Sequence, residues 1–476
     1  MSEYPYAERY PVNRGLPDHG RPRQAILDEL ATIAAAEDAT WADGRISGTI
    51  YSGDADHYAF LTRAYGHFAH VNALQRDLCP SMTRFEGEII AMVLDLMHGE
   101  AISSPHPDGA PATEPAGLVT SGGTGSILHA LLAYREHARA TRGITAPNIV
   151  KPETAHAAFD KGCHLFGIEC RTVPVDPDTT LVRPQDVAAQ IDADTMAIIG
   201  SAGSYPYGTV DPIGALSELA LARGVGLHVD GCLGGFILAF AADHGYDLPP
   251  FDFRVPGVTS ISIDPHKYGY APKGSSVVLF RDKALRTAQY FHLVGWSGGK
   301  YMSPGMDGSR SGGLLAATWA ALVQYGREGY RRYAGEILST ARELMDAVTA
   351  HPELRLMGEP TFCFSFTSTE FDIYHVADFM RPRGWRFNGQ QYPNAIHLAV
   401  TRPQTRPGVV QAFTTDLAEA VAYARQRHAD GATPELGAIY GGVAGGLTEA
   451  SEMFIVGFMN AILDSQQGLP PAQTTP

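Results

Sequence analysis

Two lysines and a histidine lie close together in SIDPHKYGYAPKG, residues 262–274, between two runs of apolar and β-branched residues. Lys267 follows the first run with His266 directly before it, and Lys273 comes a few residues later. A lysine amine in a protected site forms a Schiff base with a carbonyl group. Most lysines are solvated surface residues, so the function of Lys267 depends on which other groups the fold brings to it.

Two further stretches carry groups that fit the chemistry of such a lysine. Asp230 ends the apolar run of LHVDGCLGGF, residues 227–236, and a carboxylate at a strand end points into the crevice where α/β proteins bind ligands. TSGGTGS, residues 120–126, follows another apolar run and precedes a helical pattern, which favours an anion at the helix N-terminus.

Each stretch also has an ordinary interpretation, as a turn cap or a glycine turn, and TSGGTGS matches neither GxxxxGK[ST] nor GxGxxG. Taken together, a phosphate cradle, a buried aspartate and a strand-end lysine are the parts that an enzyme using pyridoxal 5'-phosphate (PLP) needs.

The elements that must position these groups form an alternating pattern. From about residue 117, short apolar runs alternate with helical stretches, which predicts an α/β fold with a mainly parallel sheet flanked by helices. The predicted strands are Gly117–Thr120, Asn148–Val150, Cys170–Val175, Met196–Gly200, Gly226–Val229, Ser260–Ile263 and Ser275–Phe280. One crossover helix is bounded by Asp211 as its cap, Pro212 in its first turn and Gly224 at its end.

Three segments are predicted along the chain. Residues 1–98 form an N-terminal segment that ends in an amphipathic helix, Phe85–His98, and residues 99–325 form the large PLP-binding domain. Residues 326–476 form a smaller C-terminal α+β domain with a long helix, Tyr330–Ala350, the strand-like runs CFSFT and AIHLAVT, and a disordered tail, GLPPAQTTP.

Composition indicates a globular protein, with 45% hydrophobic and 18% charged residues among 476. A net charge of -15 argues against nucleic acid or anionic membranes as general partners, because these favour basic surfaces. No apolar run approaches the ~20 residues of a membrane span, and the five cysteines show no metal-binding spacing. We expect a cytoplasmic protein with reduced thiols, no metal and no integral membrane segment.

The chain resembles the sphingosine-1-phosphate lyase family of PLP-dependent, group II decarboxylase-like enzymes. The stretches that carry the resemblance are SGTIYSGD, TSGGTGSILHA, ETAHAAFDKG, YPYGTVDP, HVDGCLGGF, FDFRVPGVTSISIDPHKYGYAPKGSSVVLFRD and SPGMDGSRSGG, with weaker similarity in QYPNAIHLAVT and GAIYGG. The resemblance implies the aspartate aminotransferase-like fold type I and a homodimer with two active sites at its interface.

The resemblance also implies roles for individual residues. Lys267 would form the Schiff base, Asp230 would pair with the pyridine nitrogen, and His156 would stack on the ring. The cofactor's other contacts would come from His266, from Gly123 and Thr124 at the phosphate, and from Ser309 of the partner subunit. Tyr51, Tyr205 and Lys273 would be catalytic or orient the substrate, Asn72 would lie near the site, and Lys273 and Arg310 would face a substrate phosphate.

The implied reaction is retro-aldol cleavage of a phosphorylated sphingoid base to a long-chain aldehyde and phosphoethanolamine. Tyr51, Tyr205, Lys273 and the substrate phosphate remain open as the proton acceptor, which needs a pKa near neutrality. Two positions depart from the family pattern, Gly125 in place of glutamate and Gln75 in place of histidine. The alternatives are an amino-acid decarboxylase and a catalytically silent PLP-fold interaction protein. The combination of Lys267, Asp230 and His156 argues against the silent protein only.

Overall fold

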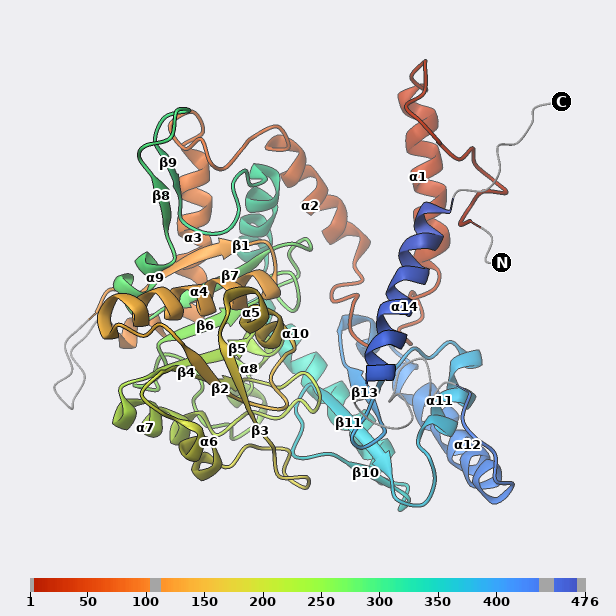
Figure 1. The fold of residues 1–476 in the computed structure, drawn as a ribbon. Coiled ribbons are helices and arrows are strands. Elements are labelled where there is room, and N and C mark those ends of the chain that lie inside the picture. Colours follow the sequence, from red (N-terminus) through yellow and green to blue (C-terminus); the bar gives the residue numbers. More distant parts are fainter. Residues whose placement is uncertain (1–3, 103–112, 436–448, 469–476) are drawn as a thin grey trace.

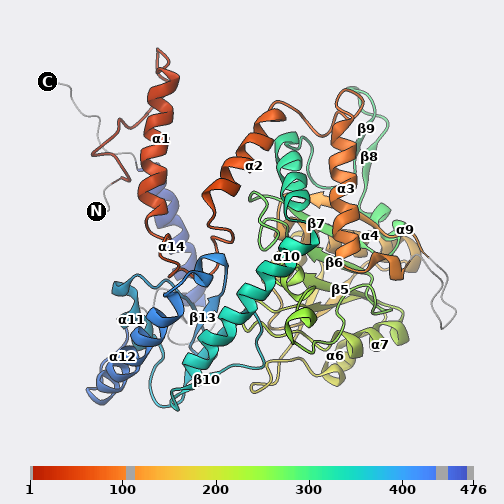
Figure 2. The same cartoon turned by 180° about the vertical axis from the view of Figure 1, so that it is seen from behind.

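A seven-stranded sheet forms the centre of the computed structural model, which describes residues 4–102, 113–435 and 449–468 (Figures 1 and 2). The strand order is β1-β7-β6-β5-β4-β2-β3. Strands β2 to β6 pair in parallel with one another, whereas β7 is antiparallel to both of its neighbours. The strands are β1 (Ala116–Thr120), β2 (Asn148–Pro152), β3 (Glu169–Val173), β4 (Thr195–Ser201), β5 (Gly226–Gly231), β6 (Ser260–Ile263) and β7 (Ser276–Phe280). Each predicted strand corresponds to one of these, so the predicted sheet is confirmed.

Successive strand residues point to opposite faces of this sheet, and each face is covered by helices. On β2, Ile149 and Val150 belong to two separate hydrophobic clusters, and on β4 Ile198 and Ile199 do the same. One face packs on α4 (Gly123–Arg142) and α5 (Ala158–Phe166), and the other on α3 (Ser81–Leu96), α7 (Ile213–Arg223) and α8 (Gly235–Leu238). Burial on both faces explains why strands such as β4 (TMAIIGS) and β7 (SVVLF) are rich in apolar residues, whereas β3 (ECRTV), at an edge of the sheet, is more polar and only partly buried. The remaining short helices of this domain are α6 (Pro184–Gln190), η2 (Ala242–His244) and α9 (Lys283–Ala288).

Helix α7 begins differently from the sequence prediction. Gly224 ends the helix in a left-handed conformation as expected, but Pro212 occupies the N-cap position and Asp211 caps nothing. The Asp211 carboxylate instead accepts a hydrogen bond from the Ser201 backbone N–H at 2.8 Å and is buried. Burial raises the pKa of Asp211 to about 7. A contact to the neighbouring strand therefore replaces the predicted local cap.

The N-terminal segment contains α1 (Arg23–Asp38), α2 (Ala55–His67) and α3, and the short helix η1 (Gly99–Ala101) follows it. The predicted helix Phe85–His98 falls largely within α3, which starts one turn earlier. Helix α1 stands away from the body beside α14 (Glu449–Gln467), and α1 has no buried residue (Figures 1 and 2).

A long helix, α10 (Gly312–Thr349), connects the large domain to the small one and is interrupted at Gly326. Gly326 has φ 56° and ψ -179°, a conformation that favours glycine. The predicted helix Tyr330–Ala350 corresponds to the second half of α10. Because α3 ends at Leu96 and α10 breaks at Gly326, we propose that the segment boundaries lie near residues 98 and 325, as predicted.

The small domain is built on an antiparallel sheet of order β10-β11-β13-β12, in which β11 and β13 are the predicted runs CFSFT and AIHLAVT. Its elements are β10 (Leu354–Leu356), β11 (Cys363–Ser368), α11 (Tyr374–Met380), η3 (Arg381–Arg383), β12 (Asn388–Gln390), β13 (Ala395–Ala399), η4 (Arg402–Thr405) and α12 (Val409–Ala429). A hairpin of β8 (Phe291–Leu293) and β9 (Tyr301–Ser303) precedes α10. GAIYGG lies outside the described residues, as does the predicted tail after residue 468.

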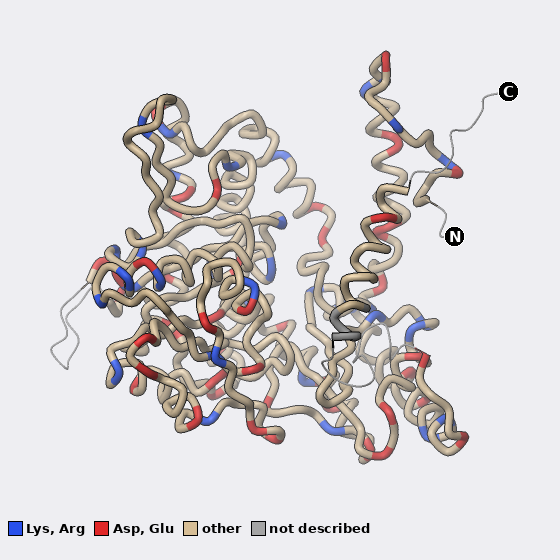
Figure 3. The backbone as a smooth tube through the Cα atoms, viewed as in Figure 1, with Lys and Arg blue, Asp and Glu red and all other residues tan. Residues whose placement is uncertain are grey.

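Acidic and basic residues are interspersed along the described part of the backbone (Figure 3). No helix in the described part of the chain combines the length and apolar composition that a membrane span requires.

Candidate active site

Lys267 lies in the turn that follows β6, where it meets a buried carboxylate. Its Nζ is 3.0 Å from Asp264 Oδ2, and the Asp264 side chain is fully buried. Burial lowers the pKa of Lys267, but the charge of Asp264 and other anionic neighbours raises it, and the net shift is upward. Asp264 is absent from the residues predicted for the site, although it lies in the same stretch as Lys267. The turn brings the two together, three residues apart.

Asp230 is the last residue but one of β5, the strand next to β6. Its Oδ1 accepts hydrogen bonds from the Ser262 hydroxyl at 3.1 Å and the Cys232 backbone N–H at 3.0 Å. Burial raises the pKa of Asp230, but the charges of His156 and Lys267 are among the effects that lower it, and the net shift is downward. Asp230 is therefore an ionised carboxylate in a buried place, which suits a cationic partner.

The N-terminus of α4 forms another wall of the site. Gly122 has φ 137°, and the helix begins with Gly123 and Thr124, so its first backbone N–H groups have no partner within the helix. A Cβ atom on Gly123 would lie 2.6 Å from Asp264 Oδ2, so a larger residue here would force the Asp264 carboxylate to move. His266 closes the same wall: its Nδ1 is 2.6 Å from the Ser275 carbonyl oxygen, and burial lowers its pKa.

These groups surround one cavity of about 290 Å³. The predicted site residues that line it are Lys267, Asp230, His156, His266, Gly123, Thr124, Tyr51 and Tyr205. The His156 ring is oriented by a hydrogen bond of 3.0 Å from the Ala158 backbone N–H to its Nδ1. The cavity offers PLP an amine for its aldehyde, a carboxylate for its ring nitrogen and a helix N-terminus for its phosphate. The residues present therefore fit the cofactor.

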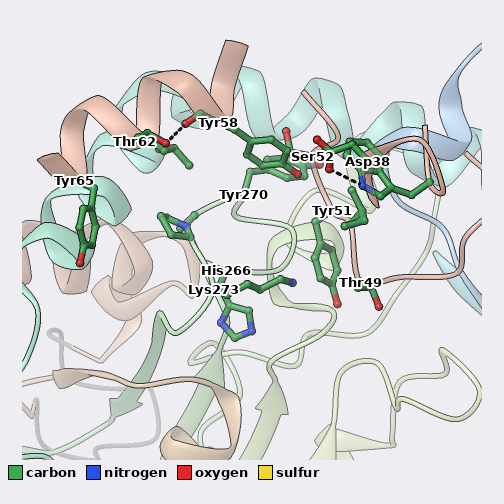
Figure 4. Close-up of a pocket in the computed structure, with 15 residues that line it drawn as sticks. Asp38, Thr49, Tyr51, Ser52, Tyr58, Thr62, Tyr65, His266, Tyr270 and Lys273 are labelled. Carbon is green, nitrogen blue, oxygen red and sulfur yellow. Dashed lines mark hydrogen bonds between the residues drawn. The ribbon is translucent and has the colours of Figure 1, made fainter. Parts of the chain in front are cut away.

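A second cavity of about 450 Å³ adjoins the first and shares Tyr51 and His266 with it (Figure 4). Its walls are largely aromatic and aliphatic, from residues that include Trp41, Ile50, Tyr58, Leu61, Tyr65, Ala271 and Pro272. Lys273 lines this cavity, with its Nζ 4.3 Å from the centre of the Tyr51 ring.

The possible proton acceptors differ in their electrostatic surroundings. Burial, followed by the charge of Lys267, lowers the pKa of Lys273 to about 8. Burial raises the pKa of Tyr51 to about 12 and also raises that of Tyr205. Among these three side chains, Lys273 alone has a pKa shifted toward neutrality.

The small domain holds the loop that carries Tyr205. The Tyr205 ring packs against His397 of β13, with 4.7 Å between ring centres. The neighbouring Pro206 carbonyl oxygen accepts hydrogen bonds from Ser365 Oγ at 2.5 Å and Gln390 Nε2 at 2.6 Å. His397 is fully buried, burial lowers its pKa to about 4, and neither ring nitrogen makes a hydrogen bond of normal geometry among the described residues. No local signal in the sequence identifies His397 as a site residue.

Asn72, Ser309 and Arg310 line neither cavity. Asn72 Nδ2 donates to Ser309 Oγ at 3.0 Å, and Asn72 Oδ1 accepts from the Arg310 backbone N–H at 3.2 Å. The Arg310 guanidinium makes two hydrogen bonds of 2.8 Å to the buried carboxylate of Glu86. Within one chain these three residues are held together, but away from the cofactor cavity.

A strand-end lysine, a buried aspartate and a helix N-terminus around one cavity of a mainly parallel sheet define a PLP-dependent enzyme of fold type I. A model of the pyridoxal-dependent decarboxylase conserved domain matches residues 5–366. The structure of a Burkholderia pseudomallei sphingosine-1-phosphate lyase is 55% identical, with a TM-score of 0.87 over 90% of this chain and 97% of that chain.

Curated sphingosine-1-phosphate lyases are similar along most of the sequence. The Drosophila melanogaster protein is 41% identical over 84% of this chain and 72% of its own length, and the Arabidopsis thaliana protein 41% over 90% and 76%. The chain belongs to the pyridoxal-dependent decarboxylase family and, within it, to the sphingosine-1-phosphate lyases. A Lactobacillus brevis glutamate decarboxylase, 22% identical with a TM-score of 0.72, shares the fold. The predicted family, fold type and cofactor are thus confirmed.

Proposed function

We propose that this enzyme cleaves a phosphorylated sphingoid long-chain base to a long-chain aldehyde and phosphoethanolamine. The observation that carries the proposal is the pair of adjoining cavities. One holds the groups that PLP needs, and the other has an apolar wall that suits an alkyl chain. The membership of the chain among the sphingosine-1-phosphate lyases supports the same substrate class.

Several side chains would hold the cofactor. PLP, when bound, supplies the electron sink for the pair released as the C2–C3 bond of the substrate breaks. Lys267 would provide the amine for its aldehyde, and the ionised Asp230 would keep a proton on its ring nitrogen. The backbone N–H groups of Gly123 and Thr124 would bind its phosphate.

Lys273 is the residue that we assign as the base for the C3 hydroxyl proton. It faces the apolar cavity next to Tyr51, and its lowered pKa leaves a useful fraction of neutral amine near neutral pH. Tyr51 and Tyr205, whose pKa values are raised, would remain protonated and donate hydrogen bonds to the substrate.

We propose that two copies of the chain complete each site. The β8–β9 hairpin exposes Val294, Trp296 and Met302, at 73%, 52% and 77%, and such apolar exposure marks an interaction surface. Asn72 and Ser309 lie outside the cavity of their own chain, as expected if each chain contributes them to the site of its partner.

Mixing two inactive variants tests this arrangement. Lys267→Ala and Asn72→Ala would each be inactive alone. An equal mixture whose subunits re-associate at random would recover about a quarter of wild-type activity, because half of its dimers are mixed and each mixed dimer has one intact site of two. No recovery between variants shown to exchange subunits would refute shared sites.

The cellular compartment is a separate proposal. All five cysteines are free in the structure, which is typical of a reducing compartment, and we propose the cytoplasm. Fractionation of cells that express the chain, with blotting of each fraction, would test this location.

A product assay tests the proposed reaction. Incubation of PLP-loaded enzyme with a phosphorylated sphingoid base should give equal amounts of long-chain aldehyde and phosphoethanolamine, and Lys267→Ala should give neither. Carbon dioxide from an amino-acid panel, without aldehyde from the base, would select the decarboxylase. A protein that binds no PLP on reconstitution would refute the cofactor site as well.

A further inference from the structure

Two neighbouring cysteines lie outside the active site, beside a chain of polar groups. Cys163 lies on α5 and Cys170 on β3, and both are free thiols. Cys170 packs against the hydrophobic cluster that contains Cys163, and the Cys170 thiol donates to Asp160 Oδ1 at 3.7 Å. Lys151 completes the chain, with its Nζ 3.3 Å from Asp160 Oδ2. The lining of the catalytic cavity contains none of these four residues.

The two thiols have unequal surroundings. Interaction with the Cys163 thiol is the largest effect on the pKa of Cys170 and lowers it, burial raises it, and the charge of Lys151, whose side chain is only 4% exposed, lowers it again. Asp160 acts in the raising direction, and the net shift is downward. The pKa of Cys163 is raised, first by its interaction with Cys170 and then by burial. Cys170 therefore has more thiolate character, and Cys163 is a protonated thiol in contact with it.

Access from solvent follows the same order. Strand β3 lies at one edge of the seven-stranded sheet, and Cys170 is partly exposed there, whereas Cys163 is buried. Of the other cysteines, Cys232 and Cys363 are buried, and burial raises the pKa of both thiols. In the described residues no group of three or more side chains is arranged to hold a metal ion, so metal binding does not account for the pair.

We propose that Cys163 and Cys170 are a modification site at which a peroxide forms an intramolecular disulfide. The Cys170 thiolate attacks one oxygen of hydrogen peroxide, so that an S–O bond forms as the O–O bond breaks. Hydroxide leaves and takes up the thiol proton to give water. The Cys163 sulfur then attacks the Cys170 sulfur, an S–S bond forms, the S–O bond breaks, and the Cys163 proton leaves with the second water. Two thiols lose two electrons and two protons, and one peroxide becomes two waters.

The sequence allows a direct measurement of this bridge. Cleavage after Lys161 and Arg171 places both cysteines in one tryptic peptide, GCHLFGIECR, residues 162–171. PLP-loaded protein would be treated with a small excess of hydrogen peroxide, unfolded with an alkylating reagent, digested and analysed by mass spectrometry. The expected peptide is unalkylated and lighter than the dithiol form by about 2 Da, and a thiol reductant reverses the change.

Single substitutions separate the roles of the two thiols. In Cys163→Ser, Cys170 should accumulate as sulfenic acid that a dimedone probe captures, and in Cys170→Ser, Cys163 should stay reduced. Cys79→Ser, at a partly exposed cysteine outside the pair, is the control and should bridge at the wild-type rate. Lys151→Gln should slow the first step several-fold. Full alkylation of the wild-type peptide after peroxide treatment, sulfinic acid at Cys170 without a bridge, or faster oxidation of Cys79 would overturn the proposal.

Discussion

Replacement of Lys273 by arginine tests the assignment of the catalytic base. Burial and the charge of Lys267 lower the pKa of Lys273 to about 8, and a base acts in its neutral form, which is present above the pKa. About one chain in eleven then carries the neutral amine at pH 7 and about ten in eleven at pH 9, so kcat/KM should rise about tenfold between these values. An ordinary lysine would give a rise that continues beyond pH 10.

Arginine keeps the positive charge but stays protonated at these pH values, so Lys273→Arg removes the base and leaves the charge. We expect kcat/KM to fall on the order of 10²-fold or more, and the rise centred near pH 8 to disappear. Lys283→Arg is the matched control, because Lys283 is an exposed lysine paired with Glu114, and it should leave the profile unchanged.

The measurement is aldehyde formation from pH 6 to pH 10, with the visible absorbance of bound PLP confirming equal loading of all variants. A Lys273→Arg enzyme that keeps both its rate and the rise near pH 8 would refute the assignment. Loss of the rise in Tyr51→Phe instead would transfer the role to the tyrosine.

Substitutions of His397, Asp211 and Gly123 test other contacts in the structure. His397→Phe keeps an aromatic ring against Tyr205 and removes two buried nitrogens without normal hydrogen bonds. Thermal denaturation should therefore show about 1 kcal/mol of added stability, with kcat nearly unchanged. His397→Ala should lower both the stability and kcat, because it removes the ring. Asp211 has a raised pKa of about 7, so its stabilising contribution is present at low pH and lost as pH rises to 7. Wild type should thus lose about 3 kcal/mol more than Asp211→Asn between pH 5 and pH 8, and equal losses would contradict this. Gly123→Ala should weaken PLP binding at least tenfold in a spectral titration, because the added Cβ would meet Asp264. Gly125→Ala is the control and should bind PLP nearly normally, because its Cβ would lie 3.2 Å from a serine hydroxyl.

Local patterns predict the central sheet well, because strands buried on both faces are short apolar runs bounded by turns. The same rules are wrong at Asp211, where a buried hydrogen bond to Ser201 replaces the expected helix cap. For the candidate site, the sequence predicts Lys267, Asp230 and Gly123, because each lies at or just after the end of a predicted strand and in the expected order along the chain. It does not predict His397, because this residue meets Tyr205 only through packing of the small domain on a distant loop. Burial, which the sequence does not reveal, decides which proton acceptor is close to neutrality.

The break at Gly326 lets the two halves of α10 run in different directions. The half that follows it lies between the domains: the Tyr330 hydroxyl donates to the Gly269 carbonyl oxygen of the large domain at 2.8 Å, and the same half packs on the small domain. The small-domain sheet binds the Tyr205 loop through Ser365 and Gln390. The position of Tyr205 in the cavity that contains Lys267 therefore depends on how the small domain packs on the large one, as well as on the loop itself.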